Sequence, residues 1–161
     1  MNYAKIQKMD IANGLGIRTV IYFCGCKFHC HNCQNKEIWS FNSGKPFDKN
    51  AKDIVFEAVS NQHVKGLSIL GGEPLQQGED LFIFLKEFKD KFPDKDVWLW
   101  TGYKLSELDE EQMKIISLCD YIVDGQYEEN NRDLMLNFRG SSNQIIWERQ
   151  KDGTFIKSEL N

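Results

Sequence analysis

Cysteine is the residue through which this chain of 161 residues could do chemistry, because four of its five cysteines fall within ten positions. Cys26, Cys30 and Cys33 have the spacing C-x3-C-x2-C, which places three thiolates on one compact loop. A cubane cluster has four irons, so three protein thiolates leave one iron open to another ligand. The spacing favours such a cluster, and the alternative that it leaves open is a structural zinc ion held by these cysteines with His29 or His31.

The remaining cysteines and the composition bear on where the protein works. Cys24 and Cys119 are interpreted as small buried residues. Disulfides of a secreted scaffold would be spread along the chain, and no apolar leader or run of about 18 apolar residues is present. We therefore expect a cytoplasmic protein. With 20 Lys and Arg against 24 Asp and Glu, the net charge is -4, so nucleic acid is not an expected partner. Without an apolar span, a membrane is not an expected partner either.

A second segment that could bind a ligand is Gly71-Gly72-Glu73-Pro74. Glycines let a ligand approach the backbone closely, and a carboxylate complements an ammonium group. Alone, this tetrapeptide would be read as a turn. Because it ends an apolar segment and follows the cysteines, it favours a ligand site, and we expect Gly72→Val to impair ligand binding while largely preserving the metal centre.

The elements that must position these residues follow from hydrophobic periodicity. Strands are predicted over 17–23, 66–70, 97–100 and 121–123, helices over 48–60, 79–92 and 106–118, and a hairpin over 145–156. The third helix is predicted to open with a capping box of Ser106 and Asp109. Alternating strands and helices indicate parallel strands with right-handed crossovers, and thus one α/β domain over residues 1–161.

The length limits how far such a sheet can close. A complete eight-fold barrel needs about 250 residues, so a partial, incomplete parallel β/α barrel is expected. The cysteine loop, 71–74, Thr101-Gly102-Tyr103 and Asp124-Gly125 each follow a predicted strand. Loops at the carboxyl ends of parallel strands lie on one side of a sheet, and this placement predicts one shared pocket.

The three-cysteine loop and the Gly-Gly-Glu-Pro segment together resemble the radical S-adenosylmethionine enzymes. Within them, the chain is similar to the activating proteins of anaerobic ribonucleoside-triphosphate reductase through further segments: 10–18, Trp39, 101–103, Asp124-Gly125 and above all Arg139-Gly140-Ser141-Ser142-Asn143-Gln144. Asn32 departs from the aromatic residue that many members place before the third cysteine, and Cys24 is an extra thiol.

This resemblance implies a radical S-adenosylmethionine fold and a defined chemistry. One electron from a 4Fe-4S cluster cleaves S-adenosylmethionine, and the resulting 5′-deoxyadenosyl radical takes a hydrogen atom from a glycine of the reductase. The implied cluster ligands are Cys26, Cys30 and Cys33. The implied S-adenosylmethionine contacts are Asn32, Cys33, Gln34, Gly71, Gly72, Glu73, Thr101, Asp124 and Arg139.

The implied partners are the anaerobic ribonucleoside-triphosphate reductase and a low-potential electron donor such as flavodoxin. Arg139 and the segment after it are expected to line the rim of the pocket, in contact with S-adenosylmethionine, the reductase's glycine loop or both. Three other functions stay open. They are activation of another glycyl-radical enzyme of the pyruvate formate-lyase type, a small-molecule radical reaction such as a ring contraction, and a noncatalytic zinc-binding interaction domain.

Overall fold

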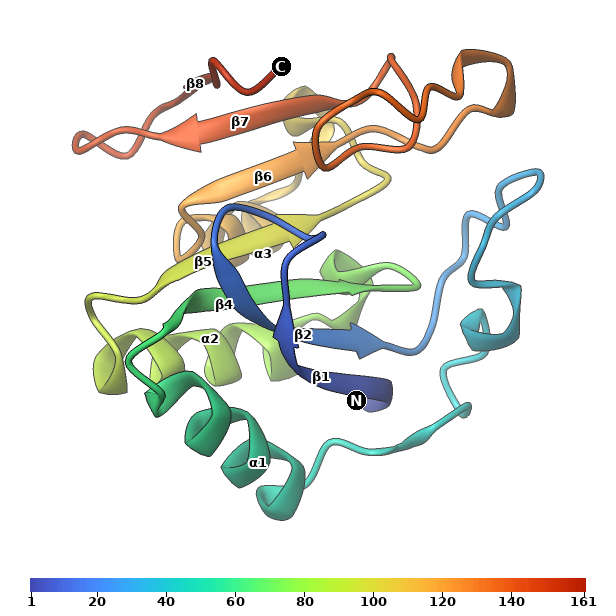
Figure 1. Ribbon diagram of the computed structural model, residues 1–161. Helices are drawn as coiled ribbons and strands as arrows, with labels where there is room; N and C mark the ends of the chain where they lie inside the picture. The colour runs from blue at the N-terminus through green and yellow to red at the C-terminus, as the bar shows by residue number, and fades with distance from the viewer.

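The computed structural model describes residues 1–161 and contains one mixed eight-stranded sheet with three α-helices (Figure 1). The strands are β1 (Asn2–Asp10), β2 (Ile17–Phe23), β3 (Lys45–Pro46), β4 (Val64–Gly71), β5 (Asp96–Trp100), β6 (Tyr121–Asp124), β7 (Ile145–Arg149) and β8 (Phe155–Lys157). The helices are α1 (Lys49–Ser60), α2 (Glu79–Lys91) and α3 (Glu110–Ile116). The longest of them, α2, has 13 residues, and no helix could span a lipid bilayer.

The sheet has a parallel centre with antiparallel flanks. Its strand order is β3-β1-β2-β4-β5-β6-β7-β8, and the pairs β2–β4, β4–β5 and β5–β6 are parallel. The parallel strands are those predicted from the sequence, and β7 and β8 form the predicted hairpin. Because β3 and β8 are the two edges of this order, the sheet does not close on itself. A partial barrel of the radical S-adenosylmethionine type stays a prediction, since strand order alone does not define it.

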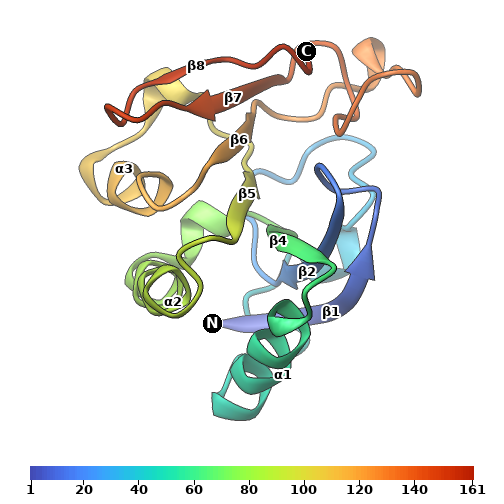
Figure 2. The ribbon, with the colours of Figure 1, turned by 60° about the vertical axis from the view of Figure 1, so that its left-hand side comes forward.

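The three helices cover one face of the sheet, as Figure 2 shows. Outward side chains of the parallel strands, such as Ile69 and Leu99, pack there against Val55 of α1 and Phe84 of α2. Most aliphatic side chains of the core lie in this layer, which fixes the helices against the sheet. The layer therefore holds the carboxyl ends of the strands in register.

The opposite face is aromatic and charged. Trp98 is fully buried there and stacks between Trp100 and Tyr121, with ring centroids 5.6 and 4.3 Å away. The fully buried Arg18 donates from Nε to Ser68 Oγ (2.7 Å) and from Nη1 to the carbonyl oxygen of Leu15 (3.0 Å). These bonds hold the loop between β1 and β2 over this face, where Figure 1 shows it crossing in front of the sheet.

The capping box predicted from Ser106 and Asp109 is wrong. Ser106 lies in a short 3-10 turn, and Asp109 is itself the N-cap of α3. Its carboxylate accepts from the N–H of Gln112 (2.8 Å), whose side-chain oxygen accepts from the N–H of Asp109 (3.1 Å). The helix therefore begins one turn later than expected, because Gln112 supplies the reciprocal bond of the capping box.

Candidate functional site

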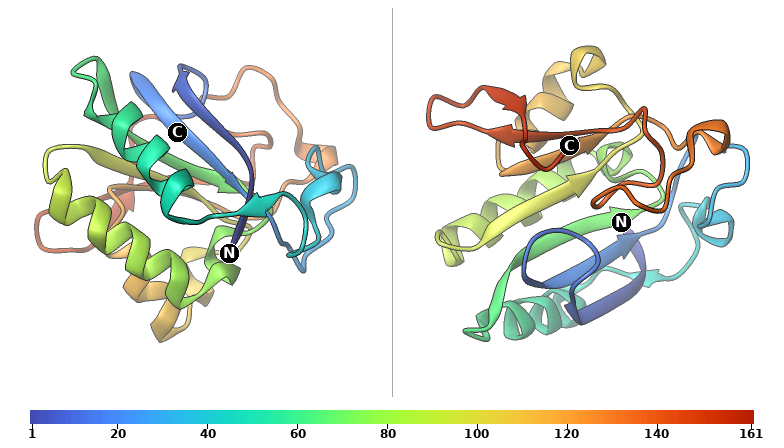
Figure 3. Two further views of the ribbon diagram at one scale, coloured as in Figure 1. Left: turned by 90° about the horizontal axis from the view of Figure 1, so that it is seen from below. Right: turned by 45° about the horizontal axis from the view of Figure 1, so that its top comes forward.

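A pocket of about 480 Å³ opens where β2, β4, β5 and β6 end. Its walls include Cys26, Gly72, Thr101 and Gly125, each from the loop that follows one of these strands. In Figure 3 the cysteine loop and the segment after β6 lie beside each other at this end of the sheet. The structure thus confirms that the loops converge on one pocket, as parallel topology requires.

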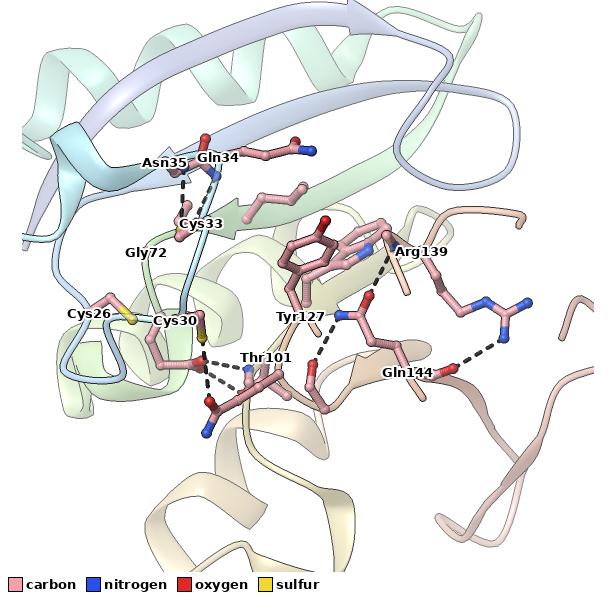
Figure 4. Close-up of a pocket in the computed structure, with 18 of the residues that line it drawn as sticks. Cys26, Cys30, Cys33, Gln34, Asn35, Gly72, Thr101, Tyr127, Arg139 and Gln144 are labelled. Carbon is pink, nitrogen blue, oxygen red and sulfur yellow. Dashed lines mark hydrogen bonds between the residues drawn. The ribbon is translucent and has the colours of Figure 1, made fainter. Parts of the chain in front are cut away.

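The cysteine loop folds back on itself through two residues in the left-handed region, His29 (φ 53°) and Asn32 (φ 55°). The N–H of Cys33 donates to the carbonyl oxygen of Cys30 (3.1 Å), which closes the turn that contains Asn32. The start of the loop is fixed by the N–H of Cys26, which donates to the carbonyl oxygen of Trp39 (2.9 Å). As a result, the three thiols of Cys26, Cys30 and Cys33 all line one end of the pocket (Figure 4).

Each of these thiols has a hydrogen-bond partner in the pocket wall. Burial raises the pKa of the Cys26 and Cys30 thiols, while backbone N–H groups that point at Cys26 act against this rise. The N–H of Asn35 donates to Cys33 Sγ (3.4 Å), and Cys30 Sγ donates to Gln126 Oε1 (3.4 Å). Iron is bound by the thiolate, and N–H groups near sulfur stabilise that form. Three thiols on one loop beside open space are therefore a donor set suited to an iron-sulfur cluster.

The zinc alternative receives no support from the side chains. No group of three or more His, Cys, Asp and Glu side chains, the three thiols included, converges on one point closely enough to hold a single metal ion. The His29 ring packs on the indole of Trp39, with centroids 4.4 Å apart, and His31 is exposed outside the pocket. A tetrahedral zinc ion needs its ligands within about 2.3 Å of one point, whereas a cubane spreads them around four irons.

The two glycines of the second motif pack against the cysteine loop. Gly71 has φ +130°, and the N–H groups of Gly72 and Glu73 donate to the carbonyl oxygens of Phe23 and Gly25, both at 2.8 Å. A Cβ at Gly72 would lie 2.4 Å from the Gly25 carbonyl oxygen. The structure argues against the expectation that Gly72→Val preserves the metal centre, because the added side chain would push against the cysteine loop itself.

Glu73 joins the loops after β4 and β5. Its carboxylate is 1% exposed and accepts from the Thr101 hydroxyl (2.7 Å), the Gly102 N–H (2.7 Å) and the Leu75 N–H (3.0 Å). Burial raises the pKa of Glu73 to about 7, although these three donors pull it downward. The predicted ligand contacts Glu73 and Thr101 both line the pocket, but their side chains are bonded to each other.

Of the other predicted S-adenosylmethionine contacts, some line the pocket and others do not. Gln34 lines the pocket with an exposed side chain, whereas Asn32 is exposed and lies outside the lining. Asp124 is buried and accepts from the N–H of Leu105 (2.7 Å); the next residue, Gly125, lines the pocket in its place. Asp124 therefore holds the loop after β5 and does not face the ligand space.

Arg139 lies at the far end of the pocket from the cysteines. Its guanidinium donates to the carbonyl oxygen of Gln144 (3.1 Å) and to Asn161 Oδ1 (3.2 Å), and Figure 4 shows it directed away from the thiols. The block that follows binds the loop after β6. Gln144 Nε2 donates to the carbonyl oxygen of Gly125 (3.0 Å), and Asn143 Nδ2 donates to that of Gln126 (2.7 Å).

Sequence reasoning missed two residues of the site, Gln126 and Asn35, whose atoms lie within hydrogen-bond distance of sulfur. Gln126 directly follows the predicted strand end at Asp124-Gly125, and this position is the signal that could have found it. Asn35 follows the third cysteine by two positions, where an N–H can turn back to the sulfur.

Three pocket thiols at the carboxyl ends of parallel strands define an iron-sulfur protein, and the comparison with protein families agrees. Residues 12–147 match the model of the 4Fe-4S single cluster domain. The chain is 39% identical over 150 residues to the anaerobic ribonucleoside-triphosphate reductase-activating protein of Escherichia coli strain K12, 40% over 153 residues to that of Pasteurella multocida, and 37% over 149 residues to that of Enterobacteria phage T4.

These alignments cover 91% of this chain and 97%, 97% and 94% of the three relatives, respectively. The chain therefore belongs to the family of anaerobic ribonucleoside-triphosphate reductase-activating proteins. This membership confirms the resemblance drawn from the motifs.

Proposed function

We propose that this chain activates an anaerobic ribonucleoside-triphosphate reductase by generating a glycyl radical on it, through reductive cleavage of S-adenosylmethionine at a 4Fe-4S cluster. The observation that carries the proposal is the presence of three thiols, and not four, in the wall of one open pocket. The nearby Cys24 is fully buried and outside the lining. A cluster held by Cys26, Cys30 and Cys33 would thus keep one iron free for S-adenosylmethionine.

The pocket has the size and walls that such a cofactor needs. Its volume of about 480 Å³ falls in the usual small-molecule range of roughly 300–1,000 Å³. Leu70, Trp100 and Phe138 are among the apolar residues that line it together with the glycine-rich loops. When bound, the cluster and S-adenosylmethionine supply the electron transfer and the radical, which protein side chains cannot supply. The residues of the chain bind and orient them and limit the access of water.

The mouth of the pocket supports a protein substrate. Leu134 and Met135, in the segment between β6 and β7, are 83% and 90% exposed, and Leu134 also lines the pocket. Exposed large apolar side chains beside a site are typical of surfaces that bind another protein. They favour delivery of the reductase's glycine over a small-molecule radical reaction such as a ring contraction.

The test is reconstitution of the protein with iron and sulfide under anaerobic conditions, followed by two assays. The first measures 5′-deoxyadenosine release from S-adenosylmethionine, with flavodoxin as the proposed low-potential donor and dithionite in its place as a control. The second measures the glycyl radical on added reductase by electron paramagnetic resonance. Zinc in place of iron, or radical formation on a pyruvate formate-lyase type enzyme only, would contradict the proposal.

The role of Arg139 toward S-adenosylmethionine or the glycine loop is part of this proposal. Since its guanidinium points away from the thiols, Arg139→Ala is expected to retain cleavage and to lose radical transfer. Loss of both would place Arg139 at the cofactor, and no change in either would refute a role in activation.

A further inference from the structure

The three thiols differ in where their hydrogen-bond partners come from. Cys26 and Cys33 receive backbone N–H groups from the cysteine loop itself. Cys30 alone also contacts a side chain from a distant part of the chain, since its Sγ lies 3.4 Å from Oε1 of Gln126, 96 residues away. That contact joins the loop after β2 to the loop after β6.

Gln126 is held in this place by backbone bonds on both sides. Its own carbonyl oxygen accepts from Asn143 Nδ2 (2.7 Å), and the N–H of Gly125 donates to the carbonyl oxygen of Tyr103 (3.0 Å). The side chain then crosses Gly102, where an added Cβ would lie 3.3 Å from its Cγ. The amide is thus carried to the sulfur by two fixed loops, so the contact is a built feature of the pocket.

The bond to Cys30 must change its direction when a metal centre forms. A protonated Cys30 thiol donates a hydrogen bond to the amide oxygen of Gln126. A thiolate that binds iron has no proton to donate, so the amide must present its N–H group instead. A turn of the terminal amide about its last torsion exchanges oxygen and nitrogen at little cost, because that torsion is broad.

We propose that Gln126 is a positioning residue that donates an N–H to the Cys30 sulfur in the cluster-loaded protein and raises the reduction potential of the cluster. The inference rests on the proposed function for the presence of the cluster. Reduction adds negative charge to the cluster and its sulfur ligands, and an N–H directed at a sulfur stabilises that charge. The effect would make it easier to load the electron that the activation needs.

The experiment is a redox titration of the reconstituted cluster without S-adenosylmethionine, followed by electron paramagnetic resonance. Gln126→Met keeps an unbranched side chain but removes the donor, and Gln126→Glu keeps the shape but offers only acceptors. We expect Gln126→Met to shift the midpoint potential downward and Gln126→Glu to shift it further. Gln34→Met makes the same change in a pocket residue with no bond to sulfur, and its midpoint should match the wild type.

Several outcomes would overturn the inference. An unchanged or higher midpoint in Gln126→Met would do so, as would an equal downward shift in Gln34→Met. Iron and sulfide are measured in each variant. If Gln126→Met holds no cluster, the midpoint potential of Gln126→Glu must still be lower than that of the wild type. A wild-type protein without a cluster would refute the proposed function. A cluster whose midpoint potential does not change on substitution of residue 126 would refute this inference only.

Discussion

The contact between Gly72 and the cysteine loop leads to a prediction that separates packing from ligand binding. Gly72→Ala adds one methyl group, whose carbon would lie 2.4 Å from the carbonyl oxygen of Gly25 and 3.1 Å from Cβ of Cys26. Ordinary van der Waals contact begins near 3.4 Å, so the two backbones must separate by about 1 Å. The Glu73 N–H to Gly25 bond, now 2.8 Å, would stretch well beyond hydrogen-bond length.

The expected cost follows from these two effects. Overpacking of a tight contact costs about 1–3 kcal/mol, and a lost hydrogen bond adds about 1 kcal/mol. We therefore expect Gly72→Ala to lower the free energy of unfolding of the metal-free protein by about 2–4 kcal/mol. Because the shift moves Cys26 relative to the other two thiols, iron content after reconstitution should fall to a minor fraction of the wild-type value.

Gly78→Ala is the matched control. Gly78 has φ +64°, and a Cβ there would meet nothing within 4 Å. Gly78 also has ψ -141°, so the variant carries backbone strain of about 1–3 kcal/mol without any steric contact, and it should keep full iron content. Urea unfolding and iron and sulfide analysis of both variants make the comparison. If Gly72→Ala retained wild-type iron content and stability, the role given to this glycine would be wrong.

Three further predictions concern the thiols, the buried carboxylate and the pocket mouth. Cys30→Ala should abolish cluster binding, whereas Cys24→Ala should keep it, as iron analysis and visible absorption would show; equal iron in both would contradict the ligand assignment. The folded-state pKa of Glu73, about 7, lies above its ordinary value of 4.5, so the folded state binds the extra proton and loses stability as the pH rises through this window, by about 3 kcal/mol in total. Urea unfolding of the metal-free protein between pH 4.5 and pH 8 should show this loss, and a flat profile or an increase would refute the burial argument. Replacing Leu134 and Met135 by Ser should lower glycyl-radical yield on the reductase several-fold with S-adenosylmethionine cleavage unchanged; the reverse pattern would argue against docking at this segment.

The parts of the fold that could be predicted from the sequence are those set by local patterns. Each parallel strand is a short apolar run that ends at a glycine or a polar residue, and α1 and α2 repeat apolar residues at helical spacing. The pocket was predictable for the same reason, because parallel topology places every following loop at one end of the sheet. The cysteine spacing, being local, also carried the class of metal centre.

The parts that sequence reasoning missed depend on irregular geometry or on distant partners. β1 escapes prediction because its register shifts between Tyr3 and Lys5 and between Gln7 and Asp10, which breaks the alternation of buried and exposed residues. The contact of Gln126 with Cys30 joins positions 96 residues apart. No local pattern contains such a contact.

The residues of the site are used mainly to hold loops in place. Glu73 joins the loop after β4 to the loop after β5. Asp124 holds the loop after β5 at Leu105, and Gln144 holds the loop after β6. Outside the pocket, Arg18 holds the loop between β1 and β2 over the face of the sheet opposite the helices. In the proposed radical mechanism the cofactor would perform the bond cleavage, so the protein would contribute mostly through the geometry of its loops. Substitutions at these residues should therefore change cluster content and stability first, and reaction rates only as a consequence.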